Sequence, residues 1–227
     1  MIVNLIRHWF FGHYTLRATR RAVKQLLRDQ RPAASRRERR ATLKRIAAEA
    51  NRHRRQDASI ATDPPSTGHL EWTSWMLAAY HELLNDFDNE QAFIDALGIK
   101  METAHGTPLI LFVLDRLMKQ FHGNPKRAAK VFEILLQQYG NFFAWDIQAD
   151  ENGMTCTITR CWYFHFFQTH GVPRLTTCAC RLDGLWFNRM DAARHGLQFN
   201  HERYTTKGYG SENCIFPIER GGFNSRA

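Results

Sequence analysis

The feature that most constrains this chain is a change in hydrophobic spacing near residue 140. Before it, apolar residues recur every three or four positions, and proline opens or glycine closes several segments, as in helices. After it, residues 142–160 alternate between apolar and polar side chains around the turn sequence DENG. That alternation is typical of a β-hairpin. Helices are therefore expected first and antiparallel strands later.

The expected elements follow from this spacing and from capping residues. Ser35, with Glu38 three residues on, predicts a capping box at the start of a helix. After the hairpin come two more helices, from about Cys161 to Thr169 and from about Leu175 to Met190, and then two strands. The fold class is α+β: a helical N-terminal part followed by a small antiparallel sheet with two inserted helices. The helices expected before the hairpin cover residues 3–30, 35–55, 70–87, 90–98, 107–123 and 124–140.

Charge divides the chain. Residues 1–60 hold 16 Lys and Arg against 4 Asp and Glu, whereas the remainder holds 15 against 18. We expect a basic helical arm with its linker over residues 1–65 and an α+β domain over residues 66–227, separated by the proline-containing stretch 57–68. The arm lacks interleaved aromatic residues for base stacking, so we expect it to dock a partner subunit or an acidic surface rather than nucleic acid. Residues 1–55 are expected to be dispensable for the fold of the remainder.

The five cysteines all fall within residues 156–214. An odd, crowded set does not suit a secreted disulfide framework. The first residues do not show the pattern of a signal peptide, and no run of about 18 apolar residues predicts a membrane span. We expect a cytoplasmic protein with reduced thiols and no transmembrane segment.

Three roles compete for these cysteines. Cys161 opens a predicted helix, where unpaired amides favour a thiolate nucleophile, and His165 or Asp183 could handle protons. Cys180 shares a helix face with Asp183 three residues on. Zinc binding is a weak alternative because there is no Cys-x-x-Cys pair, so no metal and no cofactor are expected. Packing in the core is the commonest role for any one cysteine.

The order of residues over 158–220 resembles a known family. Its pattern is a cysteine opening a helix, a second cysteine with aspartate three residues on, an arginine with threonine three residues on, and a glycine four residues before a third cysteine. This is similar to the L-2-amino-thiazoline-4-carboxylic acid hydrolase family, over roughly residues 70–220. Where the family pattern reads Cys-Asp-Phe, this chain reads Cys214-Ile215-Phe216. The matching positions here are Cys161, Cys180, Asp183, Arg203, Thr206, Gly210 and Cys214.

The resemblance implies a cysteine-dependent hydrolase that opens or deaminates a small cyclic amidine or amide. Cys161, Cys180 and Asp183 are the candidate catalytic residues. The alternative is a non-catalytic module that binds a small molecule or a metal in a pocket lined by the cysteines. We expect a small-molecule substrate as the main partner, and the chain is a candidate homo-oligomer. The candidate substrate-binding residues are Arg203, Thr206, His165 and Cys214.

Overall fold

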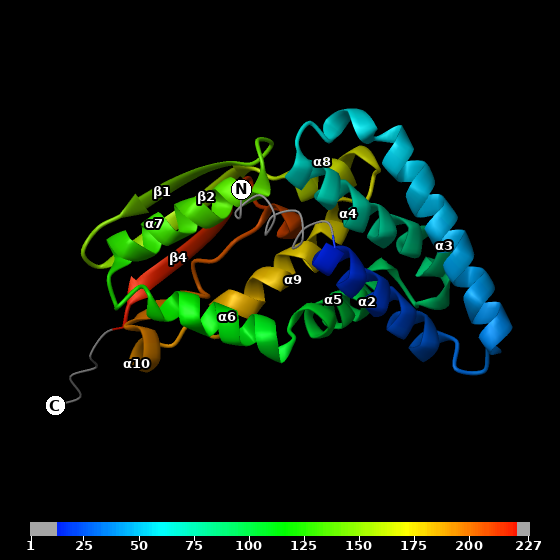
Figure 1. The fold of residues 1–227 in the computed structure, drawn as a ribbon, viewed down its shortest axis with the longest axis horizontal. Coiled ribbons are helices and arrows are strands. Elements are labelled where there is room, and N and C mark those ends of the chain that lie inside the picture. Colours follow the sequence, from blue (N-terminus) through cyan, green and yellow to red (C-terminus); the bar gives the residue numbers. More distant parts are fainter. Residues whose placement is uncertain (1–12, 222–227) are drawn as a thin grey trace. The chain divides into compact units, whose positions relative to one another are not determined.

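The computed structural model describes residues 13–221, and their fold is α+β, as expected (Figure 1). The chain divides into two compact units. The first unit takes the described chain up to His105 and returns for Trp162–Leu182. The second takes Gly106–Cys161 and the described chain from Asp183 onward. None of the described helices combines the length and the hydropathy that a membrane span needs.

The first unit is helical and is built around α4. Helix α4 contacts α2, α3 and α8, and α2 also contacts α5. Most residues of α4 are buried, because it is enclosed by neighbours rather than lying on the surface. Its helices are α2 (Thr15–Gln30), α3 (Arg36–Gln56), α4 (Pro64–Leu83), α5 (Glu90–His105), α8 (Trp162–Thr169) and the first part of α9 (Thr176–Phe187).

Side-chain caps fix where these helices begin. The predicted capping box is confirmed: Ser35 Oγ accepts from the Glu38 amide at 3.2 Å, and Glu38 accepts from the Ser35 amide at 2.7 Å. At the start of α4, Asp63 accepts from the Ser66 amide at 2.7 Å, with Pro64 in the first turn. Of the helix expected over residues 3–30, residues 3–12 lie outside the described part of the chain.

Two expectations about this unit need correction. The expected linker over 57–68 is shorter, since α4 begins at Pro64, where proline suits the first helical turn. The helix expected to end at Gly98 continues to His105. A Cβ at position 98 would lie 2.5 Å from Cδ of Arg181, so Gly98 allows close approach of that side chain and does not cap the helix.

The second unit contains an antiparallel sheet of four strands in the order β1-β2-β4-β3. The predicted hairpin forms β1 and β2, and the predicted helices lie between β2 and β3 in the chain. Helix α7 contacts β1, β2 and β4 and so covers one face of the sheet. The elements are α6 (Pro108–Lys119), α7 (Pro125–Leu136), β1 (Ala144–Ala149), β2 (Gly153–Arg160), the end of α9, α10 (Ala192–His195), β3 (Leu197–Phe199) and β4 (Cys214–Arg220).

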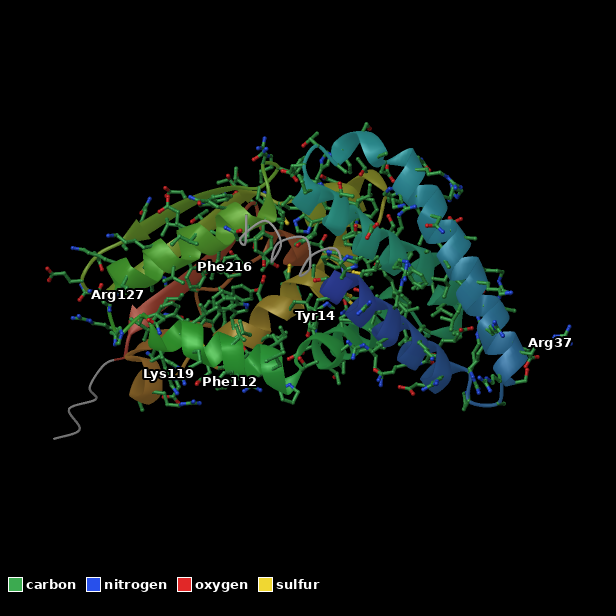
Figure 2. The ribbon with its side chains drawn as sticks, viewed as in Figure 1. Tyr14, Arg37, Phe112, Lys119, Arg127 and Phe216 are labelled. Carbon is green, nitrogen blue, oxygen red and sulfur yellow. The ribbon has the colours of Figure 1, made fainter. Side chains whose placement is uncertain are left out.

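The register decides which side chains share the covered face. Cys156 on β2 lies opposite Phe216 on β4, and Ile158 lies opposite Cys214. Directly opposite residues of antiparallel strands point to the same face. All four are buried, so both cysteines face the core of this unit. Phe216 is labelled in Figure 2 on β4.

The arm packs as part of the first unit. Leu26, Leu27 and Ile46 have no exposed surface, and their helices contact α4 and α5. Burial of large aliphatic side chains is the main source of folding stability. We therefore revise the expectation that residues 1–55 are dispensable: their removal should uncover the apolar surface of α4 and α5.

Leu26→Ala tests this revision. The substitution should lower the free energy of unfolding by about 3 kcal/mol, because it leaves a cavity in a packed interior. Chemical denaturation of the full chain measures the change. Leu109→Ala is the matched control, since Leu109 is 65% exposed and should shift stability by less than about 0.5 kcal/mol. If both substitutions changed the free energy of unfolding by the same small amount, the arm would be a separate appendage, as first expected.

Candidate functional site

Asp183 lies on the part of α9 that belongs to the second unit. It precedes Phe187 by four residues, so both side chains lie on the same face of the helix. The ring of Phe187 stacks on Phe199 at 4.2 Å and on Phe216 at 5.1 Å between centroids. Because Phe216 lies opposite Cys156 in the sheet, this stacking directs the Asp183 carboxyl toward the covered face near Cys156.

Burial raises the pKa of Asp183 to about 7. A carboxylate that loses its water without gaining a cationic partner is destabilised relative to the neutral acid. Asp183 therefore exchanges a proton near neutral pH, which is the range in which a general acid or base works best. A shifted pKa of this kind is one mark of a functional site.

Two cysteines lie within the electrostatic reach of Asp183. Burial is the main cause that raises the pKa of Cys156 to about 12, and the charge of Asp183 adds to the effect. Burial also raises the pKa of Cys214 to about 11, although the Lys207 amide donates to its Sγ at 3.3 Å and opposes the rise. Both thiols stay protonated at neutral pH. They pack beside Asp183 and are poor nucleophiles.

Tyr139 and Cys161 complete what we call the Asp183 cluster, which consists of Tyr139, Cys156, Cys161, Asp183 and Cys214. Burial raises the pKa of Tyr139, and the charges of Asp183 and Cys161 raise it further. The Tyr139 hydroxyl is therefore close enough to sense both groups and is protonated at neutral pH. Cys161 is buried and directly precedes the first residue of α8.

The other predicted residues are placed as follows. Cys180 is buried and lies three residues before Asp183 on α9. Thr206 is fully buried, and its hydroxyl has no hydrogen-bond partner among the described residues. Its neighbour Thr205 pairs with Ile215, the residue after Cys214, so Thr206 lies near the Cys214 side of the cluster. His165 is exposed on α8.

Arg203 does not join the cluster. Its side chain is exposed and donates to Glu219 at 3.2 Å. Arg203 and Glu219 line an open groove of about 710 Å³ beside the hairpin turn. Glu219 follows Cys214 by five residues, which is about 17 Å along a strand. Arg203 is therefore paired with Glu219 rather than with a member of the cluster, and its role as a substrate-binding residue stays a prediction.

Sequence reasoning missed Tyr139 and Cys156 as members of this site. Alternation of Met154, Cys156 and Ile158 indicated a buried strand face, but not what that face packs against. Tyr139 falls in the short 3₁₀ turn Gln137–Tyr139 after α7, where periodicity gives no direction for a side chain. Only the packing of α7 and α9 on the sheet brings these residues to Asp183.

The family comparison can now be stated. The model of the L-2-amino-thiazoline-4-carboxylic acid hydrolase family matches residues 76–218, which is more than half of the chain. The chain belongs to this hydrolase family. No curated protein and no solved structure matches the chain. The family match confirms the resemblance read from the sequence and contains the whole Asp183 cluster, whereas α2 and α3 lie outside it.

Asp183→Asn should stabilise the protein above neutral pH. The folded-state pKa of about 7 lies above the ordinary aspartate pKa of 3.8, so the wild type loses stability as pH rises between these two values and stays at the lower level above them. An amide of the same shape does not ionise. The gain in melting temperature should therefore grow from pH 4 to pH 7 and then level off. The exposed Glu151→Gln is the control, and a gain that does not depend on pH would contradict the assignment.

Proposed function

We propose that this chain hydrolyses a small cyclic amidine that resembles 2-amino-thiazoline-4-carboxylate. Membership of the hydrolase family supports the substrate class. The observation that carries the proposal is Asp183, a carboxyl group with a pKa of about 7. Its charge acts on Tyr139, as does that of Cys161, so we infer that Asp183 and Cys161 share one site. Such a carboxyl group can take a proton from a nucleophile and return it to a leaving group.

The reactive carbon of this substrate lies between the ring sulfur and two nitrogens. In the proposed reaction Cys161 transfers its proton to Asp183 and bonds to that carbon. The carbon–sulfur bond of the ring then breaks, and Asp183 returns the proton to the departing sulfur. Water attacks the resulting thioimidate with Asp183 as base and releases the Cys161 thiol. The sum is one water added and a ring-opened ureido thiol formed.

Cys161 is the preferred nucleophile for two reasons. The raised pKa values of Cys156, Cys178 and Cys214 keep those thiols protonated. Cys161 directly precedes α8, and the amides and dipole at a helix N-terminus stabilise a thiolate. Cys180, one turn before Asp183 on α9, is the second candidate.

We assign a substrate contact to a buried polar group that has no hydrogen-bond partner in the described part of the chain. The fully buried Thr206 hydroxyl has no partner among the described residues, and a buried hydroxyl normally has one. We assign it to a polar atom of the substrate. Arg203 could bind the substrate carboxylate only by leaving Glu219, so Thr206 is the stronger candidate. His165, exposed on α8, remains a candidate predicted from the sequence alone.

Cysteine variants test the mechanism. Cys161→Ser should lower turnover of 2-amino-thiazoline-4-carboxylate by several orders of magnitude, because a hydroxyl is a far weaker nucleophile than a thiolate. Cys180→Ser is measured beside it to decide between the two candidates. Cys178→Ser is the matched control: Cys178 donates to the Ile94 carbonyl at 3.3 Å, which serine can also do, and activity should persist. Formation of the free thiol product is followed by a chromogenic thiol reagent.

The pH profile gives an independent readout. In the wild type kcat/KM should rise with a midpoint near pH 7, as the Asp183 carboxylate becomes available. Asp183→Asn should abolish this rise. Full activity in both serine variants with the pH dependence retained would replace the thiol by a water activated by Asp183. Tight binding of a heterocycle without turnover would place the chain among non-catalytic binding modules.

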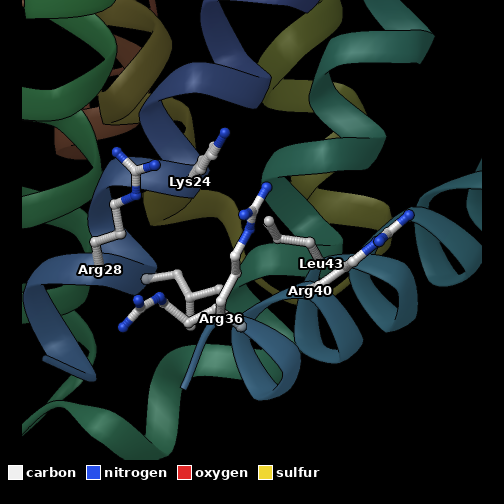
Figure 3. Close-up of a pocket in the computed structure, with 7 residues that line it drawn as sticks. Lys24, Arg28, Arg36, Arg40 and Leu43 are labelled. Atoms are coloured by element: carbon white, nitrogen blue, oxygen red, sulfur yellow. The ribbon is translucent and has the colours of Figure 1, made fainter. Parts of the chain in front are cut away.

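A second function is favoured for the arm by one surface feature. A pocket of about 590 Å³ between α2 and α3 is lined by five cationic side chains and by Leu27 and Leu43 (Figure 3). None of its lining residues is acidic. A concave surface with cationic and aliphatic lining suits an acidic peptide segment of a partner protein. The cationic residues are Lys24, Arg28, Arg36, Arg39 and Arg40.

Charge reversal tests this docking site. Arg28→Glu with Arg36→Glu should weaken binding of a fluorescent peptide of alternating glutamate and leucine by at least about tenfold at low salt. Arg55→Glu is the control, because Arg55 is an exposed residue of α3 outside the pocket. An equal loss of peptide binding in the control would show that the effect comes from net charge and not from the pocket. Self-association and a cytoplasmic location stay predictions from the sequence.

A further inference from the structure

A cluster of histidines and carboxylates lies in the first unit and shares no residue with the Asp183 cluster. Glu49 and His53 are four residues apart on one face of α3, and Asp57, four residues further, is the residue that caps its C-terminus. His81 on α4 and His170, just after α8, complete the group. Glu49, His53 and Asp57 lie outside the family match, whereas His81 and His170 lie within it. None of the five residues is used in the reaction proposed above.

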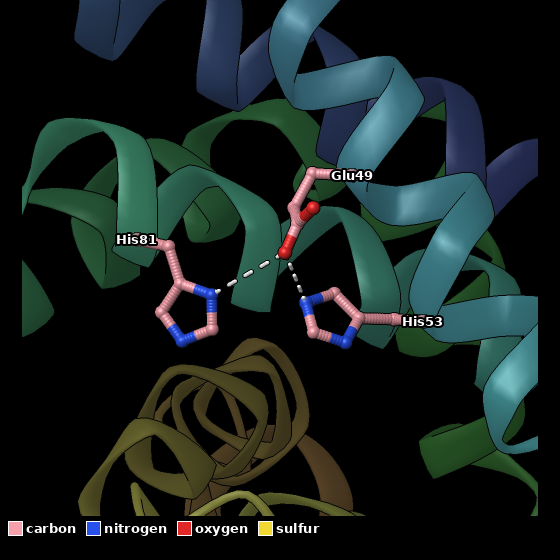
Figure 4. Close-up of side chains that lie close together, drawn as sticks. All are labelled: Glu49, His53 and His81. Atoms are coloured by element: carbon pink, nitrogen blue, oxygen red, sulfur yellow. Dashed lines mark ion pairs between the residues drawn. The ribbon is translucent and has the colours of Figure 1, made fainter.

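Three of these side chains converge on one point (Figure 4). Glu49 Oε1 lies 3.1 Å from Nε2 of His53 and 3.8 Å from Nδ1 of His81. The three ligand atoms all lie within 4.8 Å of one another. A tetrahedral zinc ion with bonds of about 2.0–2.2 Å separates its ligand atoms by about 3.3–3.6 Å. The spacing here is close to that geometry without rearrangement of α3 or α4.

His53 supplies an independent sign of a ligand. Its side chain is 3% exposed. Neither ring nitrogen makes a hydrogen bond within the described residues, although Nε2 lies within ion-pair distance of Glu49 Oε1. Buried polar atoms almost always have a partner, and an ion is one of the explanations for an exception. A metal ion between His53 and Glu49 would satisfy the imidazole lone pair that the protein leaves unsatisfied.

Arg52, three residues after Glu49 on α3, sets the orientation of the proposed carboxylate ligand. Arg52 donates to both carboxylate oxygens, at 2.9 Å to Oε2, and so orients the carboxylate. Its charge opposes a cation, but the side chain is exposed and screened by solvent.

We propose that Glu49, His53 and His81 bind one Zn²⁺ ion. Two imidazoles and one carboxylate are ligands that zinc accepts, and three protein ligands leave a fourth position for water. Asp57 and His170 pair at 3.0 Å and form a second set with His53. The ring of His170 packs edge-on against that of His53, with their centroids 5.0 Å apart.

The test uses full-length, untagged protein stripped of metal with EDTA and dialysed. ZnCl₂ is added in competition with a chromophoric chelator, and melting curves are recorded with and without one equivalent of zinc. One ion should bind per chain, and the melting temperature should rise and fall back on addition of EDTA. Glu49→Gln and His81→Ala should each weaken zinc binding by at least about tenfold. His81 is half-exposed, so its loss should not unfold the chain.

The control is His201→Ala, which removes an exposed histidine of the second unit and should leave zinc binding unchanged. Less than about 0.1 equivalent of zinc bound in tenfold excess metal would overturn the proposal. Unchanged affinity in both Glu49→Gln and His81→Ala would also overturn it. Loss of binding in His170→Ala alone would overturn the ligand set, since the ion would then belong to Asp57 and His170.

Discussion

The stacking of Phe187 between Phe199 and Phe216 is the contact on which the candidate active site depends. It fixes the end of α9 on the covered face of the sheet and thereby sets the direction of Asp183 one turn earlier. Burial is the cause that raises the pKa of Asp183. The aromatic core therefore does two things: it stabilises the unit by excluding water, and the same exclusion raises the pKa of a nearby carboxyl group toward neutral.

This arrangement has a physical consequence for the cysteines. The dry environment that activates the carboxyl raises the pKa of Cys156 and Cys214, because desolvation disfavours every charged form. A thiolate can persist only where local donors offset that penalty. This is why the proposed mechanism takes Cys161, the residue directly before α8, as the nucleophile rather than Cys156 or Cys214.

The sequence predicted the order of elements because periodicity, proline and caps are local signals. The Ser35 capping box, the DENG hairpin and the helices between β2 and β3 all follow from residues a few positions apart. What it did not predict comes from long-range packing. In the sequence Gly98 resembles a helix terminator, but in the structure it leaves room for the Arg181 side chain against the helix. Arg203 has the right spacing from Thr206, but the register of β4 gives it Glu219 as a partner. Likewise, the difference in charge predicts an arm that is separate from the rest of the chain. Leu26 and Ile46 of this arm are nevertheless fully buried.

The histidine cluster is a second case in which spacing in the sequence does not reveal long-range packing. The spacing of Glu49 and His53 on α3, and of Asp57 just after it, is visible in the sequence, yet a helix face with such residues is usually a solvated face. What changes its meaning is α4, which brings His81 to the same carboxylate and buries His53. Two of the three proposed ligands come from the arm and the third from the family-matched part of the chain. A bound ion would therefore join α3 to α4 by bonds stronger than the apolar contacts between them, and the basic arm would be a structural part of the first unit.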